Sequence, residues 1–560
     1  MRYRIPTLAA AIGLALPALG AQQAGVTALP DSIVARVDRA FATLGGKEAP
    51  GCAIGLSQDG QPVLTRAYGM ANLEYGVPNT PETIFETGSV AKQFTAAAMV
   101  LLAQDGKLSL DDDIRKHLPE VPDFGVKITI RNLLTHTSGL RDQWGLLGLK
   151  GMGPGTQVHS LATILDLVQH QKRLNFDPGS EYLYSNTGYA LAAIIVQRAS
   201  GTSLAKFSDE RLFKPIGMTN TQWRDDFTRI VKNRATAYDG TVQRGFRTNM
   251  PFTNVYGNGG LLTTVGDLLK WNVFLDNPTI LPGGATLVET LQTRMTLTSG
   301  RTIAYALGVS VGSTDGIREV THSGSTAGYS TWLARYPERK VSVAVLCNTA
   351  NASPTGYGNA ATTLLLGRVP RAPATESGDG QAVLPADQLQ RYAGLFRSPA
   401  TQLVVRTAVK NGTLVTQMPT TLTLSQTGRD RFRVPGQGEL TYHFRGDTLA
   451  ALTMVSGEDT TAFDIMSVAS PSPRELAEYA GSYWSDELET RVTFEVQDTV
   501  LVARQRPADQ ATLRPTFRDA FVGPGLGTVV FTRDAGGKVT GFGVWAGRVR
   551  NVEFRKENPR

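Results

Sequence analysis

The sequence changes in character after Leu366, and this change constrains the architecture more than any other feature. Before it, strand-like runs within 52–68 and 331–347 bracket a middle in which helical patterns dominate. Beyond residue 383, short segments alternate apolar and polar residues between turns, which is the pattern of β-strands. The 560 residues are also more than one hydrophobic core usually serves. We therefore expect several domains of different composition.

The first part predicts an α+β domain at 30–368. Its strands come from opposite ends of the segment, so they can share one antiparallel sheet only if the helices between them form an insertion. A helix that begins at Asp31 carries apolar residues at helical spacing and is therefore expected to be amphipathic. The predicted fold class is α+β, a mainly antiparallel sheet flanked by helices, with a helical subdomain.

The second part predicts two small antiparallel all-β domains at 384–469 and 474–560, after a linker at 369–383. The pattern Leu389-x-x-Tyr392-Ala-Gly recurs as Leu476-x-x-Tyr479-Ala-Gly, which indicates an internal repeat. Barrel-like closure would best remove the exposed strand edges of such small sheets.

Residues 1–21 are typical of a signal peptide. Arg2 and Arg4 precede an apolar run at 8–16, and small residues flank the expected cleavage point before Ala21. The apolar run is too short to span a bilayer, and no later segment predicts a transmembrane helix. We expect export to the periplasm or the medium.

Composition excludes several classes of function. Hydrophobic residues make up 41% and charged residues 19%, and the net charge of +7 is dispersed, so a nucleic-acid partner is not expected. The six histidines lack ligand spacing, and we expect neither a metal nor a cofactor. The only cysteines, Cys52 and Cys347, are either buried thiols or a disulfide formed in an oxidising compartment.

One serine and one lysine carry the chemistry. Ser89 and Lys92 are three positions apart in a predicted helix, so their side chains share one face and the amine can receive the hydroxyl proton. The spacing alone is weak, since 203–206 repeats it at what we interpret as an ordinary helix start. Tyr-x-Asn occurs three times, and only Tyr184-Ser185-Asn186 has suitable neighbours.

Together, Ser89-Val90-Ala91-Lys92, Tyr184-Ser185-Asn186 and His322-Ser323-Gly324 resemble the three motifs of the serine β-lactamase and penicillin-binding-protein superfamily. The segment 128–140 also matches this group. Class C β-lactamases, DD-carboxypeptidases and D-aminopeptidases are the most similar members, because they share the Tyr-x-Asn form. The resemblance covers 30–365.

The resemblance implies acyl transfer. Ser89 would attack a carbonyl carbon, while Lys92 and Tyr184 would accept its proton and pass it to the leaving group. His322 stands where classical β-lactamases usually carry a lysine, and a histidine is often neutral near pH 7. His-x-Gly is the form that resembles DD-peptidases and D-aminopeptidases.

The same resemblance implies the binding residues. Asn186 would orient the lysine and contact the substrate amide, and the backbone N–H groups of Ser89 and Ser325 would hold the oxyanion. Ser323 and Gly324 belong to the same strand, where Gly324 would let the substrate approach the backbone. We interpret His136 as a structural loop residue.

We thus expect an exported serine hydrolase, most simply a peptidase or amidase for peptides containing D-residues. Esterase or weak β-lactamase action is the first alternative, and a non-catalytic protein that binds peptidoglycan or a partner is the second. The substrate would be a small peptide, a peptidoglycan fragment or an ester; the oligomeric state is left open. In D-aminopeptidases of similar layout a loop of the last domain reaches the active site, but no residue in 475–560 can be matched to that role.

Overall fold

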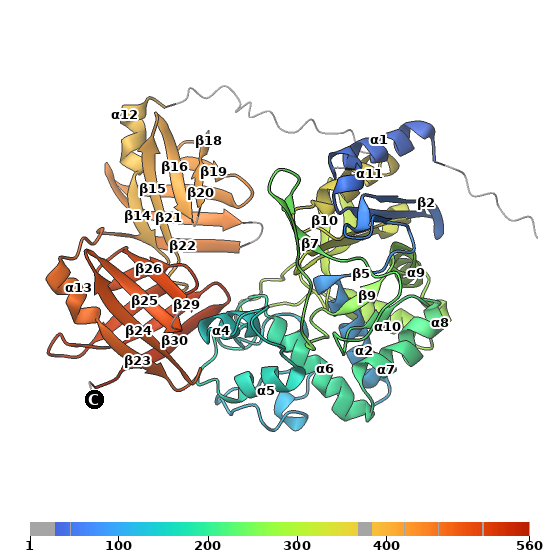
Figure 1. Cartoon of the computed structure of the whole chain (residues 1–560), viewed down its shortest axis with the longest axis horizontal. Coiled ribbons are helices and arrows are strands. Elements are labelled where there is room, and N and C mark those ends of the chain that lie inside the picture. The colour runs from blue at the N-terminus through green and yellow to red at the C-terminus, as the bar shows by residue number, and fades with distance from the viewer. Residues whose placement is uncertain are drawn as a thin grey trace, which may run out of the picture.

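The computed structural model describes residues 29–44, 46–367, 384–418, 420–456, 459–506 and 509–558. The predicted signal peptide at 1–21 and the predicted linker at 369–383 lie outside these ranges. Figure 1 shows an α+β part and two all-β parts, the last of which lies against the helices of the first. The predicted fold class is confirmed.

One six-stranded antiparallel sheet organises the α+β part. Its strands run in the order β10-β11-β12-β13-β1-β2, so that the first strand of the chain pairs with the last one of this part. The strands are β1 (Cys52–Gln58), β2 (Gln61–Tyr68), β10 (Ser310–Thr314), β11 (Ile317–Thr326), β12 (Tyr329–Tyr336) and β13 (Val341–Cys347). The sheet is therefore assembled from both ends of the segment, as predicted.

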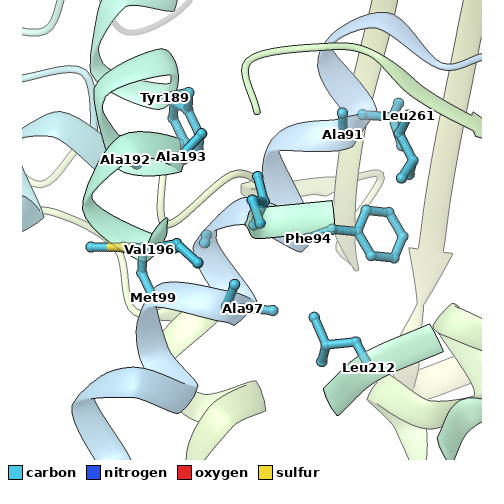
Figure 2. Packing of buried hydrophobic residues seen from close by; sticks show 14 of the residues in the cluster. Ala91, Phe94, Ala97, Met99, Tyr189, Ala192, Ala193, Val196, Leu212 and Leu261 are labelled. Carbon is cyan, nitrogen blue, oxygen red and sulfur yellow. The ribbon is translucent and has the colours of Figure 1, made fainter. Parts of the chain in front are cut away.

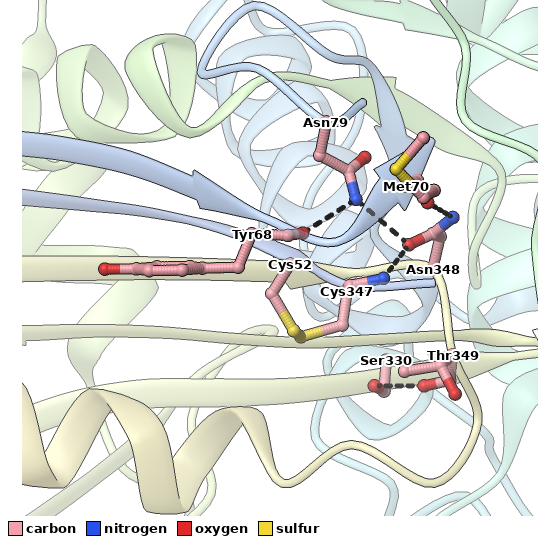
Figure 3. The surroundings of a disulfide bond; sticks show 9 residues. Cys52, Tyr68, Met70, Asn79, Ser330, Cys347, Asn348 and Thr349 are labelled. Atoms are coloured by element: carbon pink, nitrogen blue, oxygen red, sulfur yellow. Dashed lines mark hydrogen bonds between the residues drawn. A yellow bond between two sulfur atoms is a disulfide. The ribbon is translucent and has the colours of Figure 1, made fainter. Parts of the chain in front are cut away.

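A disulfide between Cys52 and Cys347 joins β1 to β13 (Figure 3). Both cysteines are fully buried and lie opposite each other in the strand register. Next to them, Asn348 accepts a hydrogen bond from the backbone N–H of Gly51 at 2.8 Å and donates one to the Met70 carbonyl at 3.0 Å. The sequence left open whether Cys52 and Cys347 are buried thiols or a disulfide, and in the structure they form the disulfide.

Helices cover both faces of this sheet because alternate strand residues point to opposite sides. Ile54 and Val345 face a cluster that includes α1 (Asp31–Phe41) and α11 (Pro354–Leu365). Ala53 and Leu346 face the larger core, which contains α2 (Lys92–Gln104) and α9 (Val265–Asp276).

The helical middle packs around α2. Figure 2 shows α2 beside α6 (Asn186–Ser200), where Ala97, Ala192 and Ala193 leave room for the two helices to approach closely. The other helices are α3 (Ile130–Leu134), α4 (Gln143–Leu149), α5 (Leu161–Gln169), α7 (Leu204–Ser208), α8 (Lys214–Ile216) and α10 (Gly284–Gln292). None of the helices in the described ranges is long and apolar enough to cross a membrane.

Short strands complete this part. β5 (Phe85–Glu86), β9 (Leu261–Thr263) and β6 (Gln222–Trp223) form a small three-stranded sheet. Its strand β5 directly precedes the single helical turn η3 (Gly88–Ala91) in the chain. The remaining pairs are β3 (Met70–Asn72) with β4 (Val77–Pro78), and β7 (Tyr238–Thr241) with β8 (Gly245–Thr248).

The two all-β parts are related but not identical. The first is a nine-stranded antiparallel sheet whose edge strands follow one another in the chain, and the second is a closed eight-stranded barrel. Their strands are β14 (Gly394–Arg397), β15 (Val404–Lys410), β16 (Thr413–Met418), β17 (Thr420–Thr423), β18 (Ser425–Gly428), β19 (Arg431–Val434), β20 (Gly438–Arg445), β21 (Thr448–Ser456) and β22 (Asp459–Met466), then β23 (Gly481–Ser485), β24 (Thr490–Gln497), β25 (Val500–Arg506), β26 (Asp509–Pro515), β27 (Ala520–Gly523), β28 (Gly527–Arg533), β29 (Val539–Ala546) and β30 (Val549–Lys556).

The repeated tyrosine explains why the two sequences share a motif. Tyr392 follows α12 (Ala386–Leu389) and donates a hydrogen bond to Asp430 at 2.8 Å. Tyr479 ends α13 (Pro473–Tyr479) and donates one to Asp519 at the same distance. Each motif therefore fastens a short helix to the turn before a later strand.

The barrel docks on α4 and α5 through a continuous apolar cluster. At its edge the buried guanidinium of Arg141 lies 2.8 Å from the buried carboxylate of Glu487, and it also donates to the Arg550 carbonyl at 3.1 and 3.0 Å. Gly145 lies so close to Val549 that a Cβ there would come within 2.6 Å of the valine Cγ2. The barrel is thus held in a fixed position on the α+β part.

Glu487→Ala should lower the free energy of unfolding by about 3–5 kcal/mol, because it leaves the Arg141 guanidinium buried without its counter-ion. Glu489→Ala is the matched control. Glu489 is half-exposed and lies 3.5 Å from Lys150, so its removal should cost at most about 1 kcal/mol. Thermal unfolding and limited proteolysis of the barrel measure the difference, and equal effects of the two substitutions would contradict the buried pair as the anchor.

Candidate active site

A cavity of about 1280 Å³ opens where the three elements that carry the sequence motifs meet. Its wall includes Ser89, Tyr184 and Asn186, the β11 residues 322–326 and the loop 249–260. Arg548, from the barrel, also lines it. The cavity is larger than many small-molecule pockets and has room for a short peptide.

The turn η3 carries Ser89 and is pressed against β11. Gly88 has a φ of +52°, and a Cβ there would lie 2.6 Å from the backbone nitrogen of Ser325. A Cβ on Gly324 would run into the Thr87 carbonyl and come within 2.9 Å of the Ser89 nitrogen. Gly324 is needed because the serine turn itself approaches β11, which differs from the predicted reason, approach of a substrate.

Lys92 begins α2 and is completely buried. Its Nζ lies 3.1 Å from Ser89 Oγ, 3.0 Å from Asn186 Oδ1 and 2.6 Å from the Asn258 carbonyl oxygen. The two carbonyl-type oxygens can only accept hydrogen bonds, so they take both protons of a neutral amine. The remaining lone pair then points to the Ser89 hydroxyl.

The surroundings favour the neutral form of this amine. Burial lowers the pKa of Lys92 well below its ordinary value of 10.5, Asp142 raises it, and Arg548 lowers it further. A buried amine with a depressed pKa is the form that can accept a proton from serine near neutral pH.

Asn186 is held in place by Asp142. Oδ2 of Asp142 accepts hydrogen bonds from the backbone N–H of Asn186 at 2.7 Å and from its Nδ2 at 2.9 Å. Because the carboxylate can only accept, the amide nitrogen faces Asp142 and the amide oxygen faces Lys92. Asn186 therefore presents an acceptor to the amine. Its roles in orienting the lysine and in binding the substrate amide stay predictions.

Two basic side chains and one imidazole lie close to the Tyr184 ring. Nζ of Lys92 is 4.8 Å and Cζ of Arg548 is 4.6 Å from its ring centroid, and the His136 ring centroid is 4.0 Å away. Burial raises the pKa of Tyr184, while the nearby Ser89 side chain lowers it by a smaller amount. Its hydroxyl is directed to the Ser89 side without meeting the geometry of a full hydrogen bond. The phenol thus stays protonated.

His136 supports this arrangement from behind. It is buried, its φ is +59°, and its Nδ1 accepts a hydrogen bond from the backbone N–H of Ser185 at 3.1 Å. The imidazole fixes the backbone between Tyr184 and Asn186, which agrees with its interpretation as a structural residue.

His322 lines the cavity with both ring nitrogens engaged. Nδ1 donates to the Ser323 carbonyl at 2.5 Å, and Nε2 accepts from the Tyr305 hydroxyl at 2.9 Å. Burial and the charge of Lys92 lower the pKa of His322 to about 4. At neutral pH the imidazole is uncharged, so it does not supply the positive charge of the lysine found at this position in β-lactamases.

Three residues of the site carried no usable sequence signal. Asp142 is an isolated acid in a loop, Asn258 contributes a backbone carbonyl that any residue type has, and Arg548 is one of many arginines in the β half. Asn258 belongs to one of the discarded Tyr-x-Asn matches. In the described ranges no group of three or more His, Cys, Asp or Glu side chains is placed to hold a metal ion.

The family model described as Beta-lactamase matches residues 37–368, more than half of the chain. This chain belongs to the Beta-lactamase family. It is accordingly a serine hydrolase in which the six-stranded sheet and helical insertion form the β-lactamase/transpeptidase-like part.

Similar proteins cover much of the chain. A D-aminopeptidase of Brucella melitensis is 26% identical over 532 residues, 91% of this chain and 96% of that protein. A D-aminopeptidase of Gluconobacter oxydans is 29% identical over 329 residues, 58% of this chain and 61% of that protein.

Solved structures agree on the fold. An octameric penicillin-binding protein homologue from Pyrococcus abyssi has a TM-score of 0.55 at 22% identity and covers 85% of this chain and 98% of that one. A penicillin-binding protein from Bacillus halodurans has a TM-score of 0.51 at 25% identity, covering 60% of this chain and 100% of that one.

The pH dependence of kcat/KM for a neutral ester should follow deprotonation of Lys92. The rate should rise with pH and level off well below 10.5, because burial lowers the lysine pKa. Asp142→Asn removes a charge that raises this pKa and should move the rise to lower pH by about one unit. Arg548→Gln removes a charge that lowers it and should move the rise to higher pH. Movement of both variants in one direction would contradict Lys92 as the titrating base.

Proposed function

We propose that this enzyme hydrolyses amide bonds in short peptides that contain D-residues, through an acyl-enzyme on Ser89. The observation that carries the proposal is the contact of Lys92 Nζ with Ser89 Oγ at 3.1 Å inside a site that keeps the amine neutral. The name D-aminopeptidase, borne by relatives aligned over 91% of the chain, supports D-peptides as the substrate class.

In the first step the Ser89 oxygen bonds to the substrate carbonyl carbon, and its proton passes to Lys92. The oxyanion would lie by the backbone N–H groups of Ser89 and Ser325, and the close packing of η3 against β11 supports this position. The carbon–nitrogen bond of the substrate then breaks, and the leaving nitrogen must receive a proton.

Tyr184 supplies that proton. Burial keeps its hydroxyl protonated, so it acts first as an acid, and the proton on Lys92 replaces the one it gives away. In deacylation the direction reverses: water bonds to the acyl carbon, its proton moves to the Tyr184–Lys92 pair, and the Ser89 oxygen leaves with a proton.

Turnover of enantiomeric peptides tests the proposal. The wild type should cleave a peptide with a D-residue at the scissile bond faster than its L-counterpart, and Ser89→Ala should show no turnover and no covalent labelling by a fluorophosphonate. Tyr184→Phe should lower kcat by about two to four orders of magnitude, the usual loss on removal of an acid–base group. Labelling at wild-type level in Ser89→Ala, or a preference for the L-peptide, would contradict the proposal.

We also propose that the protein is exported. The signal-peptide pattern at 1–21 supports export, and so does the Cys52–Cys347 disulfide, because disulfides persist mainly in oxidising compartments. Fractionation of expressing cells should recover the protein outside the cytoplasm with these residues removed; recovery of the full chain in the cytosol would contradict export.

A further inference from the structure

The barrel inserts one charged side chain into the catalytic cavity. Arg548 follows Gly547, which has a φ of +58° and forms the turn between β29 and β30. The guanidinium lies over the Tyr184 ring, 4.6 Å from its centroid, and lines the cavity. A residue more than 350 positions away in the sequence thus contacts the proton donor of the reaction.

The backbone at this turn is fixed to the α+β part. The Arg548 carbonyl accepts hydrogen bonds from Nδ2 of Asn175 at 2.9 Å and from the backbone N–H of Asp142 at 3.4 Å. Oδ1 of the same asparagine accepts one from the backbone N–H of Arg550 at 2.8 Å. The position of the guanidinium is therefore set by the docking of the barrel.

The guanidinium has one long ionic contact and no short one. Its nearest carboxylate oxygen, Oδ2 of Asp142, is 3.9 Å away and already accepts two hydrogen bonds from Asn186. The Arg548 side chain is 46% exposed, and no hydrogen bond joins it to another side chain or carbonyl in the described ranges. Its N–H donors are free for a ligand in the cavity.

The cavity offers a cation and no free anion. The only acidic residue among the described residues of its wall is Glu86, which is fully buried and bound by Arg224 at 2.8 Å and Arg234 at 3.3 Å. An ammonium group of a substrate would find no unpaired carboxylate among the described residues of this wall and would face the charge of Arg548. A carboxylate would find a planar, doubly donating partner of opposite charge.

The position of Arg548 beside Tyr184 indicates which carboxylate of a peptide substrate it would bind. Tyr184 has to contact the leaving nitrogen to protonate it, and in a peptide the α-carboxylate of the leaving residue is only one carbon from that nitrogen. Because the guanidinium lies over the Tyr184 ring, it is within reach of a carboxylate that is bound this close to the leaving nitrogen. The pKa of His322 is lowered to about 4, so its imidazole is uncharged at neutral pH and does not compete for the anion.

We propose that Arg548 binds the α-carboxylate of the residue that leaves, so that the enzyme removes a C-terminal residue from its peptides and does not select a free amino terminus. The inference rests on the proposed function, since it concerns the leaving group of the same acyl transfer. The activity inferred here, removal of a C-terminal residue, differs from the aminopeptidase activity in the names of the relatives.

Kinetics of the full chain with three substrates tests this. The substrates are an N-acetylated peptide that ends in D-Ala-D-Ala, the same peptide with a C-terminal carboxamide, and D-Ala p-nitroanilide. The wild type should favour the free acid over the carboxamide about 10- to 100-fold in kcat/KM, the scale of a hydrogen bond to a charged group. In Arg548→Gln this ratio should fall to within about threefold of unity, and Arg548→Lys should retain part of it.

Arg550→Gln is the matched control. Arg550 lies two residues later, in β30, and its side chain is 2.9 Å from Glu181 and is not part of the cavity wall. The acid-to-carboxamide ratio should therefore stay at the wild-type value. An unchanged ratio in Arg548→Gln, or a wild type that prefers D-Ala p-nitroanilide to the free acid, would overturn the inference.

Binding measurements keep the test decisive if Arg548→Gln loses all turnover. Calorimetry of the acid and carboxamide peptides with Ser89→Ala, with and without Arg548→Gln, compares their affinities in the absence of turnover. Tighter binding of the acid that is lost with Arg548→Gln supports the inference. Equal binding of the two peptides overturns it. If the wild type cleaves no substrate and takes no fluorophosphonate label, the proposed function fails, and the binding ratio still decides the role of Arg548.

Discussion

The site depends on one buried amine. An ammonium group in the position of Lys92 would be costly to keep away from water, and burial resolves the conflict by favouring the neutral form. The fold then gives the amine two oxygens that can only accept, from Asn186 and from the backbone of Asn258, and leaves its lone pair for Ser89. The close contact of η3 with β11, made through Gly88 and Gly324, fixes the serine against that lone pair.

The sequence predicted the parts of the molecule whose signals are local. The alternation of apolar residues and the turn residues predicted the strands at both ends of the α+β part, and the motif spacing predicted Ser89, Lys92 and Tyr184. The structure places Ser89 and Tyr184 in the cavity wall and Lys92 Nζ 3.1 Å from Ser89 Oγ. What could not be predicted depends on tertiary contacts: the carbonyl of Asn258 has no side-chain identity, and Asp142 acts only because the start of α6 lies next to it. The disulfide was one of two alternatives, since strand pairing between residues 295 positions apart decides it.

The barrel and the nine-stranded sheet differ in their relation to the cavity, although they repeat one motif. The barrel is held by the buried pair of Arg141 and Glu487 and contributes to the cavity wall. The described residues of the nine-stranded sheet contribute nothing to that wall; this sheet contacts the barrel, where Leu395 packs with Phe517 and Ala520. Arg141 is followed in the chain by Asp142, so the residue that anchors the barrel and the residue that orients Asn186 share one peptide segment.

The pairing of β1 with β13 has a consequence for the order of folding. During synthesis the strand that carries Cys52 is complete long before its neighbour in the sheet exists, and every helix of the insertion is made in between. Until residue 347 emerges, β1 can pair only with β2, and such two-stranded hairpins are marginally stable alone. A nascent chain interrupted anywhere in the insertion therefore lacks its central sheet, and the contact of η3 with β11 can form only after most of the α+β part has been made.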